Sequence, residues 1–101
     1  MNLLMDIKRF EKISKALGDA NRLRILDDMA SQGGALQCSQ IVSLLGLAQP
    51  SVSHHIKTLI EADLIEPEKS GRSYTYQLNR KVLKEFIAKL SSMASCFICF
   101  C

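Results

Sequence analysis

The stretch that decides the fold runs from residue 39 to residue 60 and reads SQIVSLLGLAQPSVSHHIKTLI. Its first part has apolar residues at helical spacing, with Ser39 as a suitable N-cap and Gly46 as a suitable C-terminal cap. Pro50 fits the first turn of a second helix. Four apolar residues then repeat every three to four positions, namely Val52, Ile56, Leu59 and Ile60. Two helices joined by residues 46–49 predict a helix-turn-helix over about 39–62.

Outward from this stretch the periodicity changes. Towards the N-terminus it predicts helices over about 3–17 and 20–31, ended by Gly18 and by the Gly33-Gly34 pair. Towards the C-terminus, residues 73–78 alternate in polarity and predict a strand, which returns from a shorter strand at 64–68 through a turn at Ser70-Gly71. This hairpin has the position of a wing, over about 64–78.

A last helix is predicted over about 79–95, with Asn79 as its cap. Its apolar stripe is wide and comprises Val82, Leu83, Phe86, Ile87, Leu90 and Met93. The predicted order is four helices, two strands and one helix. We therefore expect a mainly α-helical winged helix-turn-helix that occupies residues 1–101 as one domain.

Composition and charge limit the classes of protein to which this chain could belong. Hydrophobic residues make up 48% and charged residues 23%, which argues against a disordered chain. No apolar run is long enough for a membrane span, and the N-terminus has no signal-peptide core, so a cytoplasmic protein without membrane partners is expected. Residues 1–68 have a net charge of −2 and residues 69–101 a net charge of +5. The basic C-terminal third suits a polyanionic partner, although a solvated helix face would also account for it.

The helix that begins near Pro50 has the surface of a DNA-reading helix. With 100° per residue, its apolar residues share one face and small polar residues share the other. Short hydroxyl side chains let such a helix approach the major groove, where they reach phosphates and base edges. The predicted DNA contacts of this helix are Gln49, Ser51, Ser53, His54, Lys57 and Thr58.

Three further residues near the DNA-reading surface have separate interpretations. His55 lies at the flank of the buried face and is interpreted as a packing residue. Lys69 and Arg72 in the hairpin are predicted to reach the minor groove or flanking phosphates. Tyr74 either joins them or packs across the strands.

Four segments in the right order resemble the ArsR/SmtB family of bacterial winged-helix repressors. They are ALGDANRLRIL at 16–26, LAQPSVSHH at 47–55, LIEADL at 59–64 and GRSYTYQL at 71–78. The resemblance covers about residues 7–92. It implies a repressor of double-stranded operator DNA that leaves the DNA when an inducer binds. It also implies a homodimer through the first and last helices, which the wide apolar stripe of the last helix favours independently.

The resemblance also limits which inducer sites this sequence could contain. One metal site of the family uses acidic residues and histidines on the last helix, where this sequence has Glu85 but no histidine. Another uses two cysteines that flank one residue at the third helix, where this sequence has only Cys38, aligned with the intervening residue. Some arsenical-responsive members carry a cysteine cluster after the last helix, and residues 96–101 look like theirs.

The cluster consists of Cys96, Cys99 and Cys101. Trivalent arsenic or antimony takes three thiolates, so one of these ions is the expected inducer, with no cofactor required and with Cys38 as a possible fourth ligand. On a continuous helix Cys101 lies about 140° from Cys96, so three thiolates converge only if the helix ends or unwinds near Cys99. Such a change at the end of a dimer-interface helix is expected to change the angle between the two subunits. The two DNA-reading helices would then lose the spacing that the operator requires.

Other interpretations of the cysteines stay open. The thiols could sense oxidants or persulfides through a reversible disulfide, could hold a structural zinc ion together with Cys38, or could be inert apolar residues. Two other classes of protein are alternatives. One is a winged helix used for protein–protein contact without DNA, against which the polar outer face of the fourth helix and the basic C-terminal third count. A DNA-binding assay without salt dependence would favour it, because phosphate contacts weaken with salt. A thiol enzyme is disfavoured because no acid–base group accompanies the cysteines, so the protein is not expected to be an enzyme.

Overall fold

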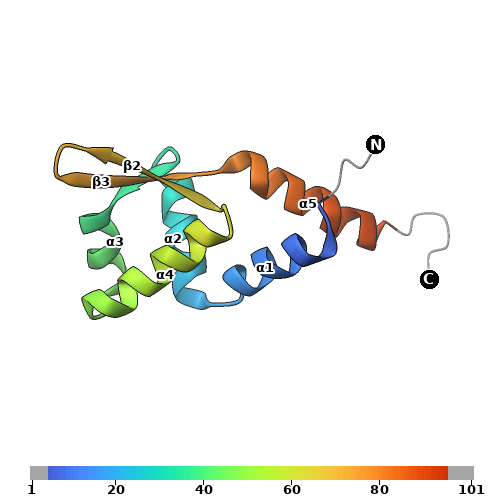
Figure 1. Ribbon diagram of the computed structural model, residues 1–101, viewed down its shortest axis with the longest axis horizontal. Coiled ribbons are helices and arrows are strands. Elements are labelled where there is room, and N and C mark those ends of the chain that lie inside the picture. The colour runs from blue at the N-terminus through green and yellow to red at the C-terminus, as the bar shows by residue number, and fades with distance from the viewer. Residues whose placement is uncertain (1–4, 96–101) are drawn as a thin grey trace.

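The computed structural model describes residues 5–95 and contains five helices and three strands in the described part (Figure 1). In chain order these are α1 (Ile7–Leu17), α2 (Ala20–Ser31), β1 (Ala35–Gln37), α3 (Cys38–Leu45), α4 (Gln49–Glu61), β2 (Ile65–Ser70), β3 (Ser73–Leu78) and α5 (Arg80–Ala94). The three strands form one antiparallel sheet in the order β1-β3-β2. The predicted winged helix-turn-helix is confirmed.

The hydrophobic core lies where α2, α3 and α4 meet the base of the sheet. Its side chains come mainly from apolar positions of the predicted helices and hairpin, and Leu36 of β1 adds one that periodicity did not predict. The largest fully buried side chains are Ile13, Ile25, Met29, Leu36, Ile41, Val52, Leu59, Leu64 and Ile65. In the described residues no polar or charged residue is fully buried, so the hydrophobic effect holds these elements together.

Several local signals act as predicted. Asn79 caps α5, with its side chain accepting a hydrogen bond from the Val82 amide at 3.3 Å. Gly18 follows the last residue of α1, and Gly46 ends α3 in the left-handed conformation with φ 63°. Pro50 lies in the first turn of α4. These residues fix where the chain leaves one helix and enters the next.

Two predicted helix starts are wrong. α1 begins at Ile7 rather than near residue 3, because the Asp6 carboxylate accepts the Arg9 amide at 2.8 Å and Met5 precedes the helix. α3 begins at Cys38, so Ser39 is inside the helix rather than its cap. There the Gln40 side chain accepts the Gln37 amide at 2.7 Å. In both cases a side chain other than the predicted cap satisfies a free amide at the helix start: Asp6 from before α1, and Gln40 from inside α3.

The sheet is larger than the predicted hairpin. β2 extends to Ser70 instead of ending at residue 68, and it pairs with the whole of β3. On the other side of β3, the short strand β1 pairs Leu36 with Tyr76. Three residues are too few to show an alternating pattern, so sequence periodicity did not reveal β1.

The molecule is elongated, with extents of 52 × 26 × 25 Å. Its radius of gyration is 15.4 Å, against about 13 Å for a compact chain of this length. Figure 1 shows why: the wing tip and α3 lie at one end, while α1 and α5 extend towards the other. α1 and α5 are joined by stacked Phe10 and Phe86 rings at 4.7 Å and by an Arg9–Glu85 ion pair at 3.4 Å.

Much apolar surface remains uncovered at the α1–α5 end. The exposed fractions are 62% for Ile7, 57% for Ile87, 49% for Leu90 and 54% for Met93. None of the helices in the described residues is both long enough and apolar enough to cross a membrane.

Candidate nucleic-acid interface

α4 presents two chemically different faces. Val52, Ile56 and Leu59 are buried against the rest of the core. The residues predicted to contact DNA are accessible. Gln49, Ser51, Ser53, His54 and Lys57 are exposed, and Thr58 is half-buried. The predicted amphipathic division of this helix is therefore present in the structure.

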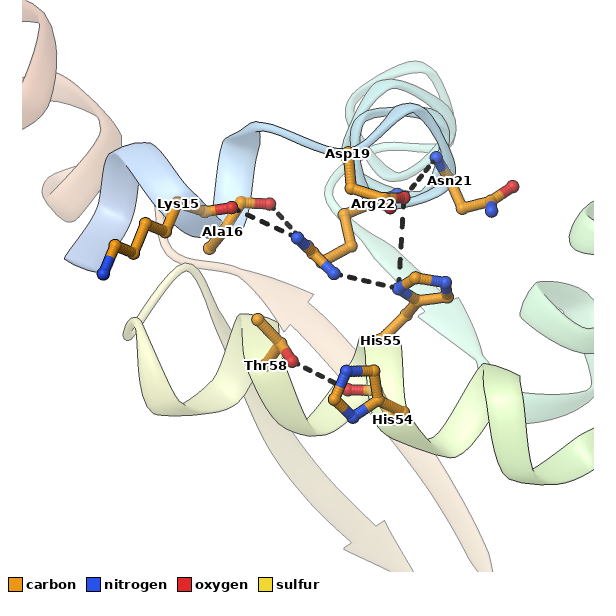
Figure 2. A network of polar contacts seen from close by, with 8 residues as sticks. All are labelled: Lys15, Ala16, Asp19, Asn21, Arg22, His54, His55 and Thr58. Atoms are coloured by element: carbon orange, nitrogen blue, oxygen red, sulfur yellow. Dashed lines mark hydrogen bonds and ion pairs between the residues drawn. The ribbon is translucent and has the colours of Figure 1, made fainter. Parts of the chain in front are cut away.

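A hydrogen bond links Thr58 to the backbone of His54 in the middle of α4. The Thr58 hydroxyl donates to the backbone carbonyl of His54 at 3.0 Å (Figure 2). This hydrogen bond occupies the hydroxyl proton and leaves the oxygen lone pairs available as acceptors. The His54 ring is exposed and its centroid lies 5.8 Å from that of His55. Figure 2 shows the two rings directed to different sides of the helix, so they do not form a metal-chelating pair.

His55 belongs to a polar network between α4 and the start of α2. Its side chain is only 12% exposed, and its Nδ1 atom lies 3.1 Å from Nη1 of Arg22 and 4.0 Å from a carboxylate oxygen of Asp19 (Figure 2). Asp19 is the N-cap of α2 and accepts backbone hydrogen bonds from Asn21 and Arg22. His55 is thus a packing residue, as predicted, but one with polar partners.

The charges of this network act on Asp19. Desolvation by itself would raise the pKa of the Asp19 carboxyl. The amide hydrogen bonds from Asn21 and Arg22, together with the nearby positive charge of Arg22, outweigh that effect. The net result is a lowered pKa, so the carboxylate stays ionised as a cap.

The wing has cationic groups near its tip. Gly71 makes the turn between β2 and β3 with φ 63°, and Arg72 beside it is exposed. Lys69 pairs across the strands with Tyr74, and its Nζ atom lies 5.9 Å from the centroid of that ring. Tyr74 also stacks on Tyr76, two residues further along the same strand, and 44% of its surface stays exposed. Burial, followed by the proximity of Cys38 and Tyr74, raises the pKa of the Tyr76 phenol.

The basic C-terminal third does not form one surface. Lys69 and Arg72 lie on the wing, whereas Arg80, Lys81, Lys84 and Lys89 lie on α5. Figure 1 shows the wing tip and α5 at different ends of the molecule. The suggestion of one local basic surface is therefore wrong, because β3 carries the chain away from the tip before α5 begins. Lys57 on α4 and the two wing cations Lys69 and Arg72 are exposed.

The cysteines fall into two groups. Cys38 is a free, half-buried thiol at the start of α3, beside a cleft of about 310 Å³ that Arg72 and Tyr74 also line. Cys96, Cys99 and Cys101 lie outside the described residues. Within residues 5–95 no group of three or more His, Cys, Asp or Glu side chains is arranged to hold a metal ion.

Sequence reasoning missed Arg22 as part of this region. The Arg22 guanidinium contacts a residue 33 positions away, and no local spacing indicates such a contact. Asp19 does carry a signal, because an Asp directly before an apolar helical segment is a common N-cap.

An exposed polar helix that follows a tight turn, with a cationic hairpin beside it, defines a winged helix-turn-helix DNA-binding domain. The comparisons with known proteins agree. Residues 17–68 match the family described as "Helix-turn-helix domain". The chain is 34% identical over 87 residues to the arsenical resistance operon repressor of Staphylococcus aureus, covering 86% of this chain and 82% of that protein.

Two further matches extend this comparison. The transcriptional repressor SdpR of Bacillus subtilis is 33% identical over 75 residues, covering 74% of this chain and 81% of that protein. The crystal structure of an ArsR family transcriptional regulator superposes with a TM-score of 0.84 at 21% identity, covering 97% of this chain and 99% of that one. The chain belongs to the ArsR family and is a DNA-binding transcriptional repressor.

Proposed function

We propose that this protein is a homodimeric repressor that reads its operator with the exposed face of α4 and with the wing. We further propose that trivalent arsenic or antimony, bound by Cys96, Cys99 and Cys101, releases it from DNA. The observation that carries the second part is the set of three thiols within six residues, in a chain related to an arsenical resistance operon repressor.

The DNA-reading part rests on the chemistry of the accessible α4 surface. Ser51, Ser53 and His54 offer short hydrogen-bonding groups, and Lys57 offers a cation for a phosphate. Arg72 at the tip of the wing offers a second cation, for phosphates of the DNA backbone beside the site that α4 reads. The wing tip and the start of α4 lie at the end of the molecule opposite to α5 (Figure 1).

The dimer rests on the apolar residues of α1 and α5 that the single chain leaves exposed. A patch of this kind marks an interaction surface. A two-fold dimer through it would present two α4 helices, and these would meet successive major grooves if their spacing were about 34 Å. A change in the orientation of α1 and α5 at the dimer interface would then alter the spacing of the two α4 helices and so the affinity for the operator.

The inducer part rests on the donor set. Thiolates are soft ligands that favour soft ions such as trivalent arsenic. α5 ends at Ala94 and Ser95 has an extended backbone, so the described helix stops before Cys96. The predicted condition that the helix must end for three thiolates to converge is compatible with this boundary. When bound, the ion would link the cysteines next to a helix of the dimer interface.

The experiment uses fully reduced protein without oxygen, bound to fluorescent DNA from its own promoter. Arsenite is titrated and release is followed by anisotropy. We expect release near one ion per chain, and no release for C96S or C99S. C38S is the matched control: if C38S still responds, the tail is sufficient, and if it does not, Cys38 joins the site. DNA that stays bound under arsenite contradicts the arsenical inducer, and release by persulfide or peroxide instead would establish the thiol-redox alternative.

A salt titration of the same complex tests the DNA-reading surface. Each lysine–phosphate contact adds about 0.9 to the slope of log affinity against log salt concentration. In a dimer, K57Q should therefore reduce the magnitude of the slope by about 2. K84Q, at an exposed position of α5, should leave it unchanged. An unchanged slope in K57Q would remove α4 from the interface.

A further inference from the structure

Arg22 links three helices with one guanidinium group. Its Nε atom donates to the Ala16 carbonyl at 2.7 Å and its Nη2 atom to the Lys15 carbonyl at 3.1 Å, both at the C-terminal end of α1. Its Nη1 atom lies 3.1 Å from Nδ1 of His55 on α4 (Figure 2). The planar fork of an arginine allows all three contacts at once, which an ammonium group cannot reproduce.

The contact also defines the protonation state of His55. A guanidinium has donors and no acceptor, so Nδ1 of His55 must carry a lone pair. The ring in this arrangement is therefore neutral, with its proton on Nε2. Among the described residues, no hydrogen bond to that Nε2 atom is present and no buried polar side-chain atom lacks a partner, so Nε2 faces solvent.

We propose that Arg22 and His55 are positioning residues for DNA recognition: the guanidinium, anchored on the end of α1, holds α4 in its reading orientation through the neutral imidazole of His55. His55 is the part of α4 that makes this link, since the other polar side chains of the helix lie on its exposed face. Because α1 also packs on α5, the link joins the reading helix to the apolar end of the molecule. The inference rests on the proposed DNA-reading role of α4.

Two substitutions of His55 distinguish its role as a hydrogen-bond acceptor for Arg22 from a purely structural role in packing. The Oδ1 atom of asparagine occupies the same bonding distance from Cβ as Nδ1 of histidine, so H55N keeps an acceptor for Arg22. H55Q places its amide one bond further away and mimics Nε2 instead. Helix propensity favours glutamine over asparagine. A purely structural role therefore predicts better function for H55Q, whereas the positioning role predicts better function for H55N.

The assay is operator affinity by anisotropy, with thermal unfolding of each variant measured alongside. We expect H55N to bind within about threefold of the wild type and H55Q to lose on the order of tenfold, as loss of one charge-assisted hydrogen bond allows. R22K should lose a similar factor, because lysine cannot keep all three contacts. R24K is the matched control, since Arg24 also lies on α2 but donates to the Leu44 carbonyl of α3. H55Q binding as tightly as H55N, or R22K as tightly as R24K, would overturn the inference.

Failure of this inference is distinguishable from failure of the proposed function. If K57Q weakens operator binding while Arg22 and His55 variants do not, α4 reads DNA without this link. If K57Q and substitutions at His54 also leave binding unchanged, the proposed DNA-reading role of α4 is itself wrong.

Discussion

Leu90 offers the sharpest test of the homodimer. It lies on α5 with 49% of its surface exposed. Complete burial of a leucine side chain contributes about 2 kcal/mol, so burial of the remaining half in a dimer contributes about 1 kcal/mol. A two-fold dimer contains two copies. Truncation to alanine should therefore weaken the dimer by about 2 kcal/mol, or about thirtyfold in its dissociation constant.

Sedimentation equilibrium of the reduced protein without DNA measures this constant directly. The matched control is Y74A, because Tyr74 is 44% exposed but lies on the wing. It should leave the dimer constant unchanged. A dissociation constant for L90A within threefold of the wild-type value would refute the reasoning. So would a wild-type protein that stays monomeric at tens of micromolar, or a Y74A variant that dissociates as easily as L90A.

Three further predictions concern stability. L59A should lower the free energy of unfolding by about 3 kcal/mol in urea titrations, because Leu59 is fully buried in α4 and its removal leaves a cavity. G46A should lower the free energy of unfolding by about 1 kcal/mol, because an added Cβ meets no atom within 4 Å and only the left-handed φ of 63° opposes the substitution. G18A is the control and should lower the free energy of unfolding by less, because Gly18 has a φ of −83°. Asp19 has a lowered pKa in the fold, so the stability it contributes is present above its ordinary pKa of 3.8 and is lost as the pH falls through the lower, folded value. D19N keeps a capping oxygen but does not titrate, and its unfolding free energy should vary less with pH below 4 than that of the wild type; equal pH dependence in the two proteins would contradict this.

The helices and the wing were predictable because their signals are local. Apolar spacing placed α2 and α4, and Gly18, Pro50 and Asn79 act within one turn of a helix end. The errors were local too. The start of α1 and the start of α3 each depended on which of several polar side chains captures the first amides, and sequence spacing does not rank those competitors.

The candidate site was predicted in part for the same reason. The exposed face of α4 follows from its helical period, so the residues proposed to read DNA could be named from sequence. Periodicity also separated His54 on the accessible face from His55 on the flank, and the structure agrees. Periodicity could not predict the contacts of His55, because its partner Arg22 belongs to another helix.

The sequence by itself determined the order of the elements, the buried and exposed faces of each helix, and the family. These properties depend on residues within a few positions of one another, or on motifs whose order is visible in the chain. Only the tertiary structure decided that β1 adds a third strand, that the basic residues after position 68 divide between the wing and α5, and that Arg22 joins α1 to α4. Each of these depends on how distant segments pack together, and packing is a property of the whole core rather than of any local spacing.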